Sequence, residues 1–308
     1  MLSVFQKTIS SETSFKGVGL HSGLETEVRI IPAAENYGIV FKRTDLNKNN
    51  IIKANFKNVS SAKLCTTLQN EFGTSVSTVE HLLAALYIIG VDNALIEISN
   101  TEVPIMDGSS KEFVETLKRT GLRNLNAKRK YLKITKKFEL KDNEREISIE
   151  PNIDGLKVEF RLVYSNNIIG TQTNEINFTK NELTDVYTSR TFCLYEDIEK
   201  IKKIGLAKGG SLDNAVVIKE DEILNPGGLR NDKEFVNHKI LDLAGDFLLS
   251  GHRILGSVKC TQGGHSLSNM FLRAFFEDKT NYAIIELEKS VLDKTYFKTP
   301  ANKLAVNA

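Results

Sequence analysis

Three ionisable side chains recur at four-residue steps in one apolar stretch, EFVNHKILDLAGDFLLSGH, which covers residues 234–252. They are His238, Asp242 and Asp246. In an α-helix, residues four apart lie on nearly the same side, roughly one turn along the axis. Apolar residues fill most of the remaining circumference, which predicts a buried helix. Buried ionisable groups are costly unless they are paired, hydrogen-bonded or bound to a metal. The stretch therefore indicates either an internal His–Asp pair or a metal site.

A second histidine that could share such a site is His81, in the stretch STVEHLLAAL. The chain has only five histidines, so a site with two imidazoles has few candidates. His238 and Asp242 have the i, i+4 spacing that lets two side chains reach one ion, and His81 would add the second imidazole. Three protein ligands with one open position are the pattern of catalytic zinc. Water bound to such an ion becomes a nucleophile near neutral pH.

Two nearby carboxylates, Glu80 and Asp246, are not metal ligands in this hypothesis. Glu80 stands next to a proposed ligand and is placed to act as general base, whereas Asp246 could orient an imidazole from outside the metal's ligand shell. The structural alternative for Glu80 is a capping box with Ser77 at the start of a helix. His81 could equally be a core residue on the apolar face of that helix.

His265 follows two glycines in the stretch TQGGHSLSN. Glycines permit unusual backbone angles and the close approach of a ligand. The alternative is a plain turn that carries a surface histidine.

The elements that must position these residues come in groups of strands followed by helices, which favours an α+β fold over a doubly wound sheet. We predict a domain at 1–126 and a second at 127–308, because the polar, basic segment 124–130 is the best boundary candidate. An insertion near 193–224 holds a helix and the apolar strand NAVVI. Strands are expected at 25–31, 38–43, 94–99, 131–140, 146–150, 156–164 and 282–288, and helices at 78–89, 110–120, 196–204, 234–249 and 267–276.

Composition excludes several classes of function. The 41 basic and 39 acidic residues are spread along the chain, which argues against nucleic-acid binding. Three widely spaced cysteines indicate a reducing compartment without a disulfide framework or a cysteine-based zinc site. The start of the chain has no apolar core of signal-peptide length, and no window is long and apolar enough for a membrane span. We therefore expect a cytoplasmic protein.

Eight stretches occur in order over nearly the whole chain: GVGLHSG (17–23), LCTTL (64–68), STVEHLLAAL (77–86), VPIMDGSS (103–110), SRTF (189–192), GLAKGGSLDNAVV (205–217), EFVNHKILDLAGD (234–246) and GGHSLSN (263–269). Together they resemble the UDP-3-O-acyl-N-acetylglucosamine deacetylase family, zinc amidases that commit the pathway to lipid A. Each stretch alone is a weak signal, whereas the ordered set is highly specific.

The resemblance implies two similar α+β domains, each a β-sheet packed on a helix layer, with small insertions and the active site between the domains. It implies one catalytic Zn²⁺ per chain on His81, His238 and Asp242, with Glu80 as the base. It also implies an acylated UDP-amino-sugar as substrate and a monomeric enzyme.

Further roles follow from the same resemblance. His265 matches the family's electrophilic or proton-donating histidine, and Asp246 the partner that keeps it charged. Thr191 matches a hydroxyl that helps to hold the oxyanion, and Lys239 a cation that contacts the substrate. The remaining matches concern substrate binding: Phe192 packs on the sugar, Phe160 stacks on the uracil, and Ile198, Leu212, Ala215 and Val217 form the wall of an apolar passage for the acyl chain.

One position departs from the family's pattern. Family members often carry a basic residue suited to a diphosphate three residues before His265, whereas this chain has Gln262. Lys259 is a candidate to compensate. Cys65 and His21 belong to matched stretches near the site, and neither is assigned a role.

Two other classes of function use the same residues. Two histidines and one carboxylate also form the Fe(II) facial triad of oxygenases, although that interpretation leaves Glu80 and His265 idle. A non-catalytic nucleotide-sugar binding protein would leave the polar stripe of residues 238–246 unexplained.

Overall fold

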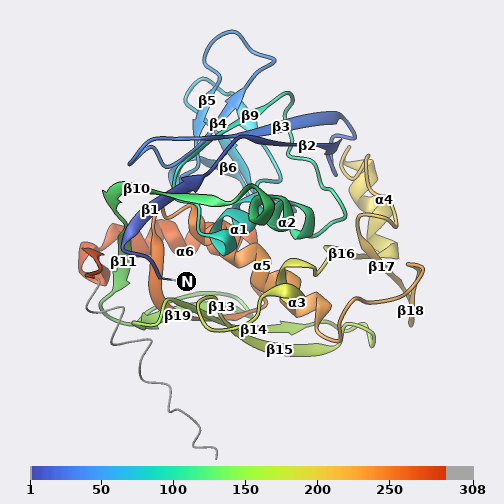
Figure 1. Cartoon of the computed structure of the whole chain (residues 1–308). Helices are drawn as coiled ribbons and strands as arrows, with labels where there is room; N and C mark the ends of the chain where they lie inside the picture. The colour runs from blue at the N-terminus through green and yellow to red at the C-terminus, as the bar shows by residue number, and fades with distance from the viewer. Residues whose placement is uncertain (1, 289–308) are drawn as a thin grey trace, which may run out of the picture.

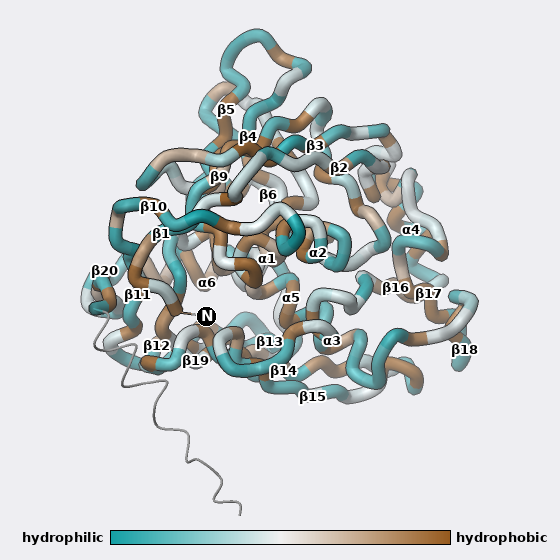
Figure 2. Tube along the Cα trace, in the orientation of Figure 1, coloured by the Kyte–Doolittle hydropathy of each residue, from teal (hydrophilic) through white to brown (hydrophobic). Residues whose placement is uncertain are grey.

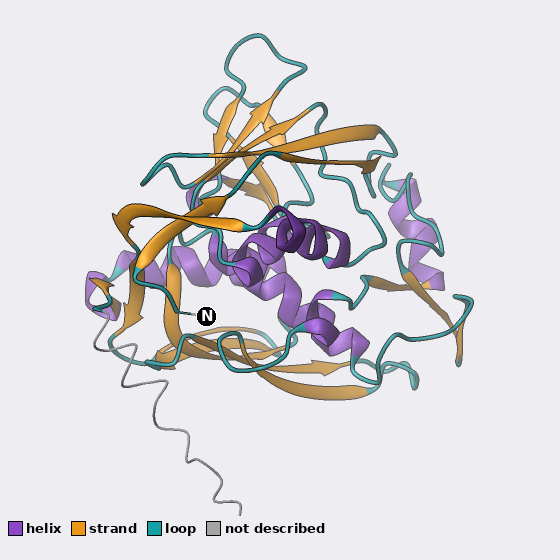
Figure 3. Ribbon diagram, viewed as in Figure 1, coloured by secondary structure: helices purple, strands orange, loops and turns teal. Residues whose placement is uncertain are grey.

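Two β-sheets enclose a layer of helices in the computed structural model, which describes residues 2–288 (Figures 1 and 3). The upper sheet comes from the first half of the chain and has the order β2-β3-β9-β4-β5. Its strands are β2 (Thr13–Val18), β3 (Glu25–Pro32), β9 (Ala94–Ile98), β4 (Ile39–Arg43) and β5 (Ile51–Lys53). The helices of this half are α1 (Glu80–Ile89) and α2 (Lys111–Thr120), with the short helix η1 (Phe56–Asn58) after β5. A small sheet of β6 (Val59–Ser61), β7 (Thr67–Gln69) and β8 (Ser75–Val76) precedes α1.

The lower sheet comes from the second half and has the path β12-β13-β19-β11-β20, with β14 and β15 joined to it through β19. Its strands are β11 (Lys130–Ile134), β12 (Phe138–Asp142), β13 (Arg145–Pro151), β14 (Leu156–Val163), β15 (Thr171–Asn177), β19 (Arg253–Thr261) and β20 (Tyr282–Glu286). The helices of this half are α3 (Thr184–Tyr187), α5 (Glu234–Leu248) and α6 (His265–Glu277), with η2 (Lys279–Asn281) before β20.

Alternation of apolar and polar residues decides which face of each sheet meets the helices. In β3, Thr26, Val28 and Ile30 are buried while their neighbours are exposed, and β14 alternates in the same way. The helix α5 lies between the sheets, and every one of its residues except Lys239 is buried. Figure 2 shows the corresponding contrast between the apolar α1 and the mostly hydrophilic outer strand β15. Any ionisable side chain on α5 must therefore find its partners inside the protein.

The predicted insertion forms a separate small unit beside the main layers (Figure 1). It contains β16 (Phe192–Leu194), α4 (Tyr195–Lys203), β17 (Val216–Lys219) and β18 (Glu222–Ile223), and its three strands make their own sheet. The predicted helix and apolar strand of this segment are thus confirmed.

Two details differ from the sequence-based expectations. The expected strand 131–140 is divided into β11 and β12, with a bend between them. The segment 124–130, expected to be a polar boundary, lies largely within β10 (Leu122–Lys128), which pairs with β1 (Phe5–Ile9) as a two-stranded ribbon. A ribbon with both faces partly open to water accepts polar residues on both sides, so polarity alone did not indicate a loop. The expected division at 126/127 falls inside this strand.

The α+β class is confirmed, with helices packed against sheets in both halves of the chain. Within residues 2–288, none of the helices has the length and apolar character needed to cross a membrane.

Candidate active site

Three helices bring the predicted ionisable residues to one place between the sheets. Glu80 and His81 occupy the first turn of α1, and His265 is the first residue of α6. The α5 stripe supplies the other three: His238, Asp242 and Asp246. The side chains of all six residues are at most 9% exposed. Burial of so many ionisable groups together is expected of a functional site rather than of a packing core.

His81, His238 and Asp242 form a compact group of possible metal ligands. One ligand atom from each lies within 4.8 Å of the others. Oδ1 of Asp242 is 3.5 Å from Nε2 of His81 and 3.4 Å from Nε2 of His238. This carboxylate oxygen is buried and has no hydrogen-bond partner within residues 2–288. Two imidazole nitrogens facing one unpartnered carboxylate oxygen fit the three protein ligands of a metal ion with an open position.

The surroundings of His238 hold the imidazole in the form that binds metals. The distance from its Nδ1 to the carbonyl oxygen of Ser189 is 3.1 Å, so Nδ1 carries the proton and Nε2 faces Asp242. Burial is the largest effect on the pKa of His238 and lowers it to about 3, against the opposing charge of Asp242. The imidazole is therefore neutral near pH 7.

The surroundings of Asp242 also stabilise its ionised form. Burial raises the pKa of this carboxyl, but His238 and Lys239 outweigh burial and hold the pKa well below its usual range. Nζ of Lys239 lies 2.9 Å from Oδ2 of Asp242, on the side away from the ligand oxygen Oδ1.

His265 and Glu80 form an acid–base pair beside the possible ligands. Nε2 of His265 is 3.6 Å from Oε1 of Glu80, and Nδ1 is 2.9 Å from Oδ2 of Asp246. Burial lowers the pKa of His265, but the carboxylates of Asp246 and Glu80 together raise it to about 10. Burial raises the pKa of Glu80, against the attraction of His265 and His81. The site thus holds a charged imidazole and a carboxylate of increased basicity.

Thr66 connects the two halves of this acid–base pair, and the sequence did not single it out. Its backbone N–H donates to Oε2 of Glu80 at 3.0 Å, and its hydroxyl donates to Oδ1 of Asp246 at 2.7 Å. The residue lies in the matched stretch LCTTL, which was the only signal in the sequence that pointed to this segment. Thr66 is itself buried.

The contact of Glu80 with Thr66 also decides against the capping-box interpretation. The helix α1 has Val79 as its N-cap without a side-chain hydrogen bond, and the hydroxyl of Ser77 donates to the carbonyl of Thr101 instead. The turn into the helix is made by Thr78, which has a φ of 55°. The carboxylate of Glu80 is therefore free of a capping role and points toward His265.

Gly245 permits α1 and α5 to approach closely at the catalytic residues. A Cβ atom at this position would lie 2.1 Å from the carbonyl oxygen of Glu80 and 3.1 Å from the amide nitrogen of Ala84. Any side chain would push the first turn of α1 away from α5, and with it Glu80 and His81. Sequence reasoning missed this residue because a glycine inside a helix does not show which backbone lies against it.

The segment before Phe192 borders the site along α5. A buried ion pair between Arg190 and Glu234, with Nε and Oε1 2.7 Å apart, ties this segment to the start of α5. The backbone of Thr191 is fixed by bonds to Gly108 and Val216. Phe192 places its ring centroid 6.4 Å from that of His238, and Nζ of Lys239 lies 5.5 Å from the same aromatic ring. Phe192 and Lys239 thus lie beside the group of possible metal ligands.

Other predicted substrate contacts are not brought to the site in the expected way. The ring of Phe160 is 1% exposed, and a Cβ on Gly263 would lie 3.3 Å from it, so the ring presents no free face for stacking. Lys259 pairs with Glu159 at 3.1 Å and does not compensate for the missing cation. Neighbouring residues of a strand point to opposite faces, and Lys259 is exposed next to the buried Cys260.

Gln262 has a structural role. Its side-chain oxygen accepts a hydrogen bond from the N–H of Val163 at 2.9 Å, and its amide nitrogen donates to the carbonyl of the same residue. The side chain thereby extends the pairing of β19 with β14 beyond Thr261. The two glycines of TQGGH were expected to permit unusual backbone angles, but the left-handed residue of this stretch is Gln262, with φ 54°, and Gly264 is extended. Gly263 is needed for its close approach to Phe160 and Cys260.

His21 and Cys65 both lie in buried positions. Glu102 accepts hydrogen bonds from the backbone N–H of His21 at 2.9 Å, and both ring nitrogens of His21 are buried without a hydrogen-bond partner in the described part of the chain. Burial lowers the pKa of His21 and raises that of the Cys65 thiol to about 12. Both side chains are therefore uncharged near pH 7.

The insertion packs against the loop that carries His21. The N–H of Gly209 donates to the carbonyl of Leu20 at 3.0 Å, and a Cβ on Gly209 would lie 2.4 Å from the carbonyl oxygen of Gly19. Among the predicted passage residues, Ala215 and Val217 are buried, Ile198 is half-buried and Leu212 is 41% exposed.

A buried group of two histidines and one aspartate, beside a carboxylate base and a charged histidine, defines a metal-dependent hydrolase type of site. The family model described as UDP-3-O-acyl N-acetylglycosamine deacetylase matches residues 6–277. A deacetylase of that name from Shewanella sp. (strain ANA-3) is 38% identical over 300 residues, which cover 96% of this chain and 98% of the relative. The same enzyme of Aliivibrio fischeri (strain ATCC 700601 / ES114) is 38% identical over 303 residues, covering 97% and 99%.

The chain therefore belongs to the UDP-3-O-acyl-N-acetylglucosamine deacetylase family. This membership agrees with the resemblance found in the sequence. It does not favour an oxygenase or a non-catalytic binding protein.

Proposed function

We propose that this protein hydrolyses the N-acetyl group of UDP-3-O-acyl-N-acetylglucosamine to UDP-3-O-acyl-glucosamine and acetate, the committed step of lipid A biosynthesis. The observation that carries the proposal is the position of Glu80 and His265 on one side of the two-histidine, one-aspartate group. Family membership supplies the substrate class, which is that of the named relatives. The cytoplasm is the proposed compartment, which rests on the sequence-based expectation.

His81, His238 and Asp242 would hold the metal, which we propose to be one zinc ion per chain. The unpartnered Oδ1 of Asp242 and the neutral Nε2 of His238 are the donors such an ion requires. A bound zinc ion polarises a carbonyl oxygen and lowers the pKa of a water molecule. The rest of the reaction depends on protein groups.

Glu80 acts as the base. Its raised pKa makes it a better proton acceptor than an ordinary carboxylate, so it removes the proton from the attacking water. Thr66 holds its other oxygen, which leaves Oε1 directed toward His265 and the reaction centre. The carboxylate is thus oriented before the substrate arrives.

His265 acts as the cation of the site. Asp246 keeps the imidazole protonated, so Nε2–H donates to the oxygen that becomes negative in the tetrahedral intermediate and then supplies the proton to the leaving amine. Thr191 is proposed as a second donor to that oxygen. A preorganised donor of this kind contributes about 3–4 kcal/mol to transition-state stabilisation.

Recognition of the substrate is proposed to divide between two surfaces. Phe192 packs on the sugar, and Lys239 contacts the substrate beside the site, where its ammonium group already lies against the Phe192 ring. The insertion, through Ile198, Leu212, Ala215 and Val217, bounds the path of the acyl chain. Phe160 would serve as a uracil platform only after its ring became exposed, so we leave it outside the proposed contacts.

Acetate release from UDP-3-O-acyl-GlcNAc tests the proposal. Wild type should release acetate, a chelator should abolish release, and added Zn²⁺ should restore it. Glu80→Gln should keep the metal and the fold and lose about 10²–10⁴-fold in kcat, the usual contribution of a general base. Glu139→Gln, a change of the same type in the exposed strand β12, serves as the control. Near wild-type turnover in Glu80→Gln would exclude Glu80 as the base.

A further inference from the structure

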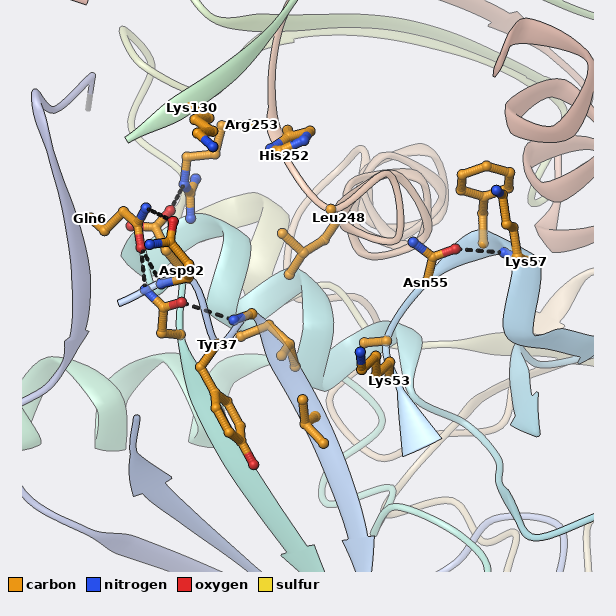
Figure 4. A pocket seen from close by; sticks show the side chains of 18 of the residues that line it. Gln6, Tyr37, Lys53, Asn55, Lys57, Asp92, Lys130, Leu248, His252 and Arg253 are labelled. Carbon is orange, nitrogen blue, oxygen red and sulfur yellow. Dashed lines mark hydrogen bonds and ion pairs between the residues drawn. The ribbon is translucent and has the colours of Figure 1, made fainter. Parts of the chain in front are cut away.

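A cavity of about 800 Å³ opens between the two halves of the chain at the far end of α1 and α5 (Figure 4). Leu248, the last residue of α5, and His252, just beyond it, line the cavity, whereas His238 faces the candidate active site from the beginning of that helix. At 1.5 Å per residue, His238 and Leu248 are separated by roughly 15 Å along the axis. The cavity is therefore distinct from the active site and has the size of small-molecule sites, roughly 300–1,000 Å³.

Positive charge is concentrated in this cavity. Six lysine and arginine side chains line it against a single carboxylate, Asp92, while the whole chain has 41 basic and 39 acidic residues. Subtraction gives an excess of five positive charges in the cavity and two in the whole chain. The cationic lining residues are Lys53, Lys57, Arg129, Lys130, Arg253 and Lys279.

Two guanidinium groups at the base of the cavity share the one carboxylate. Nη2 of Arg129 is 2.6 Å from Oδ2 of Asp92, and Nε of Arg253 is 3.5 Å from Oδ1. Nη2 of Arg129 also donates to the carbonyl of Gly90, just after α1. Nη1 and Nη2 of Arg253 donate to the carbonyls of Tyr87 and Leu86 in the last turn of α1. Nε of Arg253 is buried and has no hydrogen-bond partner within residues 2–288. Burial and the charge of Arg129 lower the pKa of Arg253. Asp92 therefore leaves one charge at the base uncompensated.

Unlike the two arginines, the lysines on the rim have no carboxylate partner within residues 2–288. Among the described residues, Lys53, Lys57, Lys130 and Lys279 form no ion pair. Figure 4 shows Lys53 and Lys57 on one side of the cavity, with Lys130, His252 and Arg253 on the other. An anion held between the two sides would meet cations from both.

One wall of the cavity is aromatic. The rings of Phe56 and Phe276 stack with centroids 4.8 Å apart, and Tyr282 packs edge-on against Phe276 at 4.9 Å. Asparagine side chains add neutral hydrogen-bonding groups to the lining. Cations facing an aromatic wall suit a ligand with both negative charge and an apolar or planar part.

We propose that this cavity is a binding site for a small, soluble phosphate ester that carries more than one negative charge. Guanidinium and ammonium groups are the usual protein partners of phosphate oxygens. The site does not depend on the proposed deacetylation, because the cavity shares none of its lining residues with the active site.

Binding of inorganic pyrophosphate, measured by calorimetry at low salt, tests the proposal. The decisive variant is Lys53→Ser/Lys130→Ser/Lys279→Ser, which removes three exposed rim charges. Its matched control is Lys48→Ser/Lys202→Ser/Lys203→Ser, which removes three exposed charges elsewhere. Thermal melts should show that both variants fold. We expect wild type and the control to bind alike, and the rim variant to lose at least tenfold in affinity while retaining acetate release.

Two further measurements identify where the anion binds and whether it is a lipid headgroup. Lys239→Ala should keep pyrophosphate binding, because Lys239 belongs to the active site. Vesicles of phosphatidylglycerol should not co-sediment with the protein more than neutral phosphatidylcholine vesicles do. The proposal is overturned if wild type does not bind pyrophosphate, if the rim variant binds as tightly as the control, or if Lys239→Ala abolishes binding. Binding to anionic vesicles alone, lost in the rim variant, would also overturn it, because the ligand would then be a lipid headgroup.

Discussion

Thr66 donates its hydroxyl hydrogen to Asp246 at 2.7 Å, across 180 residues of sequence. The same residue donates its backbone N–H to Glu80. One threonine therefore orients both the proposed base and the carboxylate that keeps His265 charged. Because it does not contact the reacting atoms through its side chain, Thr66 is a positioning residue.

Substitution of Thr66 separates this positioning from packing. Thr66→Val keeps the shape and the backbone bond to Glu80 but removes the donor to Asp246. A buried acceptor without its donor costs about 1–3 kcal/mol, so we expect a loss of kcat and a displaced pH profile with unchanged zinc content. Thr66→Ser should retain most of the activity. Equal kinetics for the valine and serine variants would show that the hydroxyl has no part in catalysis.

The metal site makes a separate prediction. His81→Ala, His238→Ala and Asp242→Ala should each weaken zinc binding by orders of magnitude, because three ligands are the minimum of a catalytic zinc site. Zinc content after dialysis checks this, with the titration starting below one equivalent so that any second, inhibitory ion does not enter the count. His252→Ala, remote from the group, is the control. A triple variant that bound zinc as well as wild type would exclude these ligands.

Asp246→Asn should move the alkaline limb of the pH profile. The reaction needs protonated His265, so activity falls as the pH rises through its pKa, which is about 10 with Asp246 ionised. Loss of that negative charge lowers the pKa, by about one to three units for a close ion pair. The alkaline limb should therefore shift to lower pH, while the acidic limb, set by Glu80, stays nearly in place. A profile of kcat/KM against pH measures both limbs, and an unmoved alkaline limb would contradict the role of Asp246.

Gly245→Ala should damage stability and activity together. The added methyl group meets the carbonyl of Glu80, and overpacking of this kind costs about 1–3 kcal/mol. Thermal melts and zinc binding should both weaken, because the first turn of α1 must move away from α5. Ala244→Gly, the adjacent helical position, should lower stability by roughly 1–2 kcal/mol, through helix propensity and the loss of one buried methyl group, without selective loss of zinc. If Gly245→Ala kept full activity, the close approach would not be required.

Periodicity made the stripe on α5 predictable, because His238 and Asp242 are placed on one face by the helix itself. The shortage of histidines pointed to His81, and its neighbour Glu80 followed. His265 was assigned to the site only through the resemblance to a known family, since nothing local brings His265 to Glu80. Neither periodicity nor the resemblance assigned a role to Thr66 or Gly245. Their roles depend on which atom of a distant segment lies opposite, and that is decided by how α1 packs against α5. Phe160 is the opposite case: the resemblance assigned it a role in stacking on the uracil, but its ring is buried against Gly263.

The insertion makes the last prediction. If the apolar residues of the insertion line the path of the acyl chain, each methylene group of that chain that they bury contributes about 0.8 kcal/mol to affinity. Deacetylation of UDP-GlcNAc without the acyl group should then be far slower, with a large loss in kcat/KM. Ala215 and Val217 are buried, so an aspartate at either position tests folding as much as binding. Leu212 is 41% exposed and accepts the change without unfolding.

Leu212→Asp should therefore reduce kcat/KM on the acylated substrate and leave turnover of the non-acylated compound and the zinc content unchanged. Ile204→Asp is the matched control, because Ile204 is 55% exposed in the same insertion and was not assigned to the passage. Melting temperatures of both variants should match wild type. A Leu212→Asp variant that melts normally and still prefers the acylated substrate by the wild-type factor would place the path of the acyl chain away from Leu212.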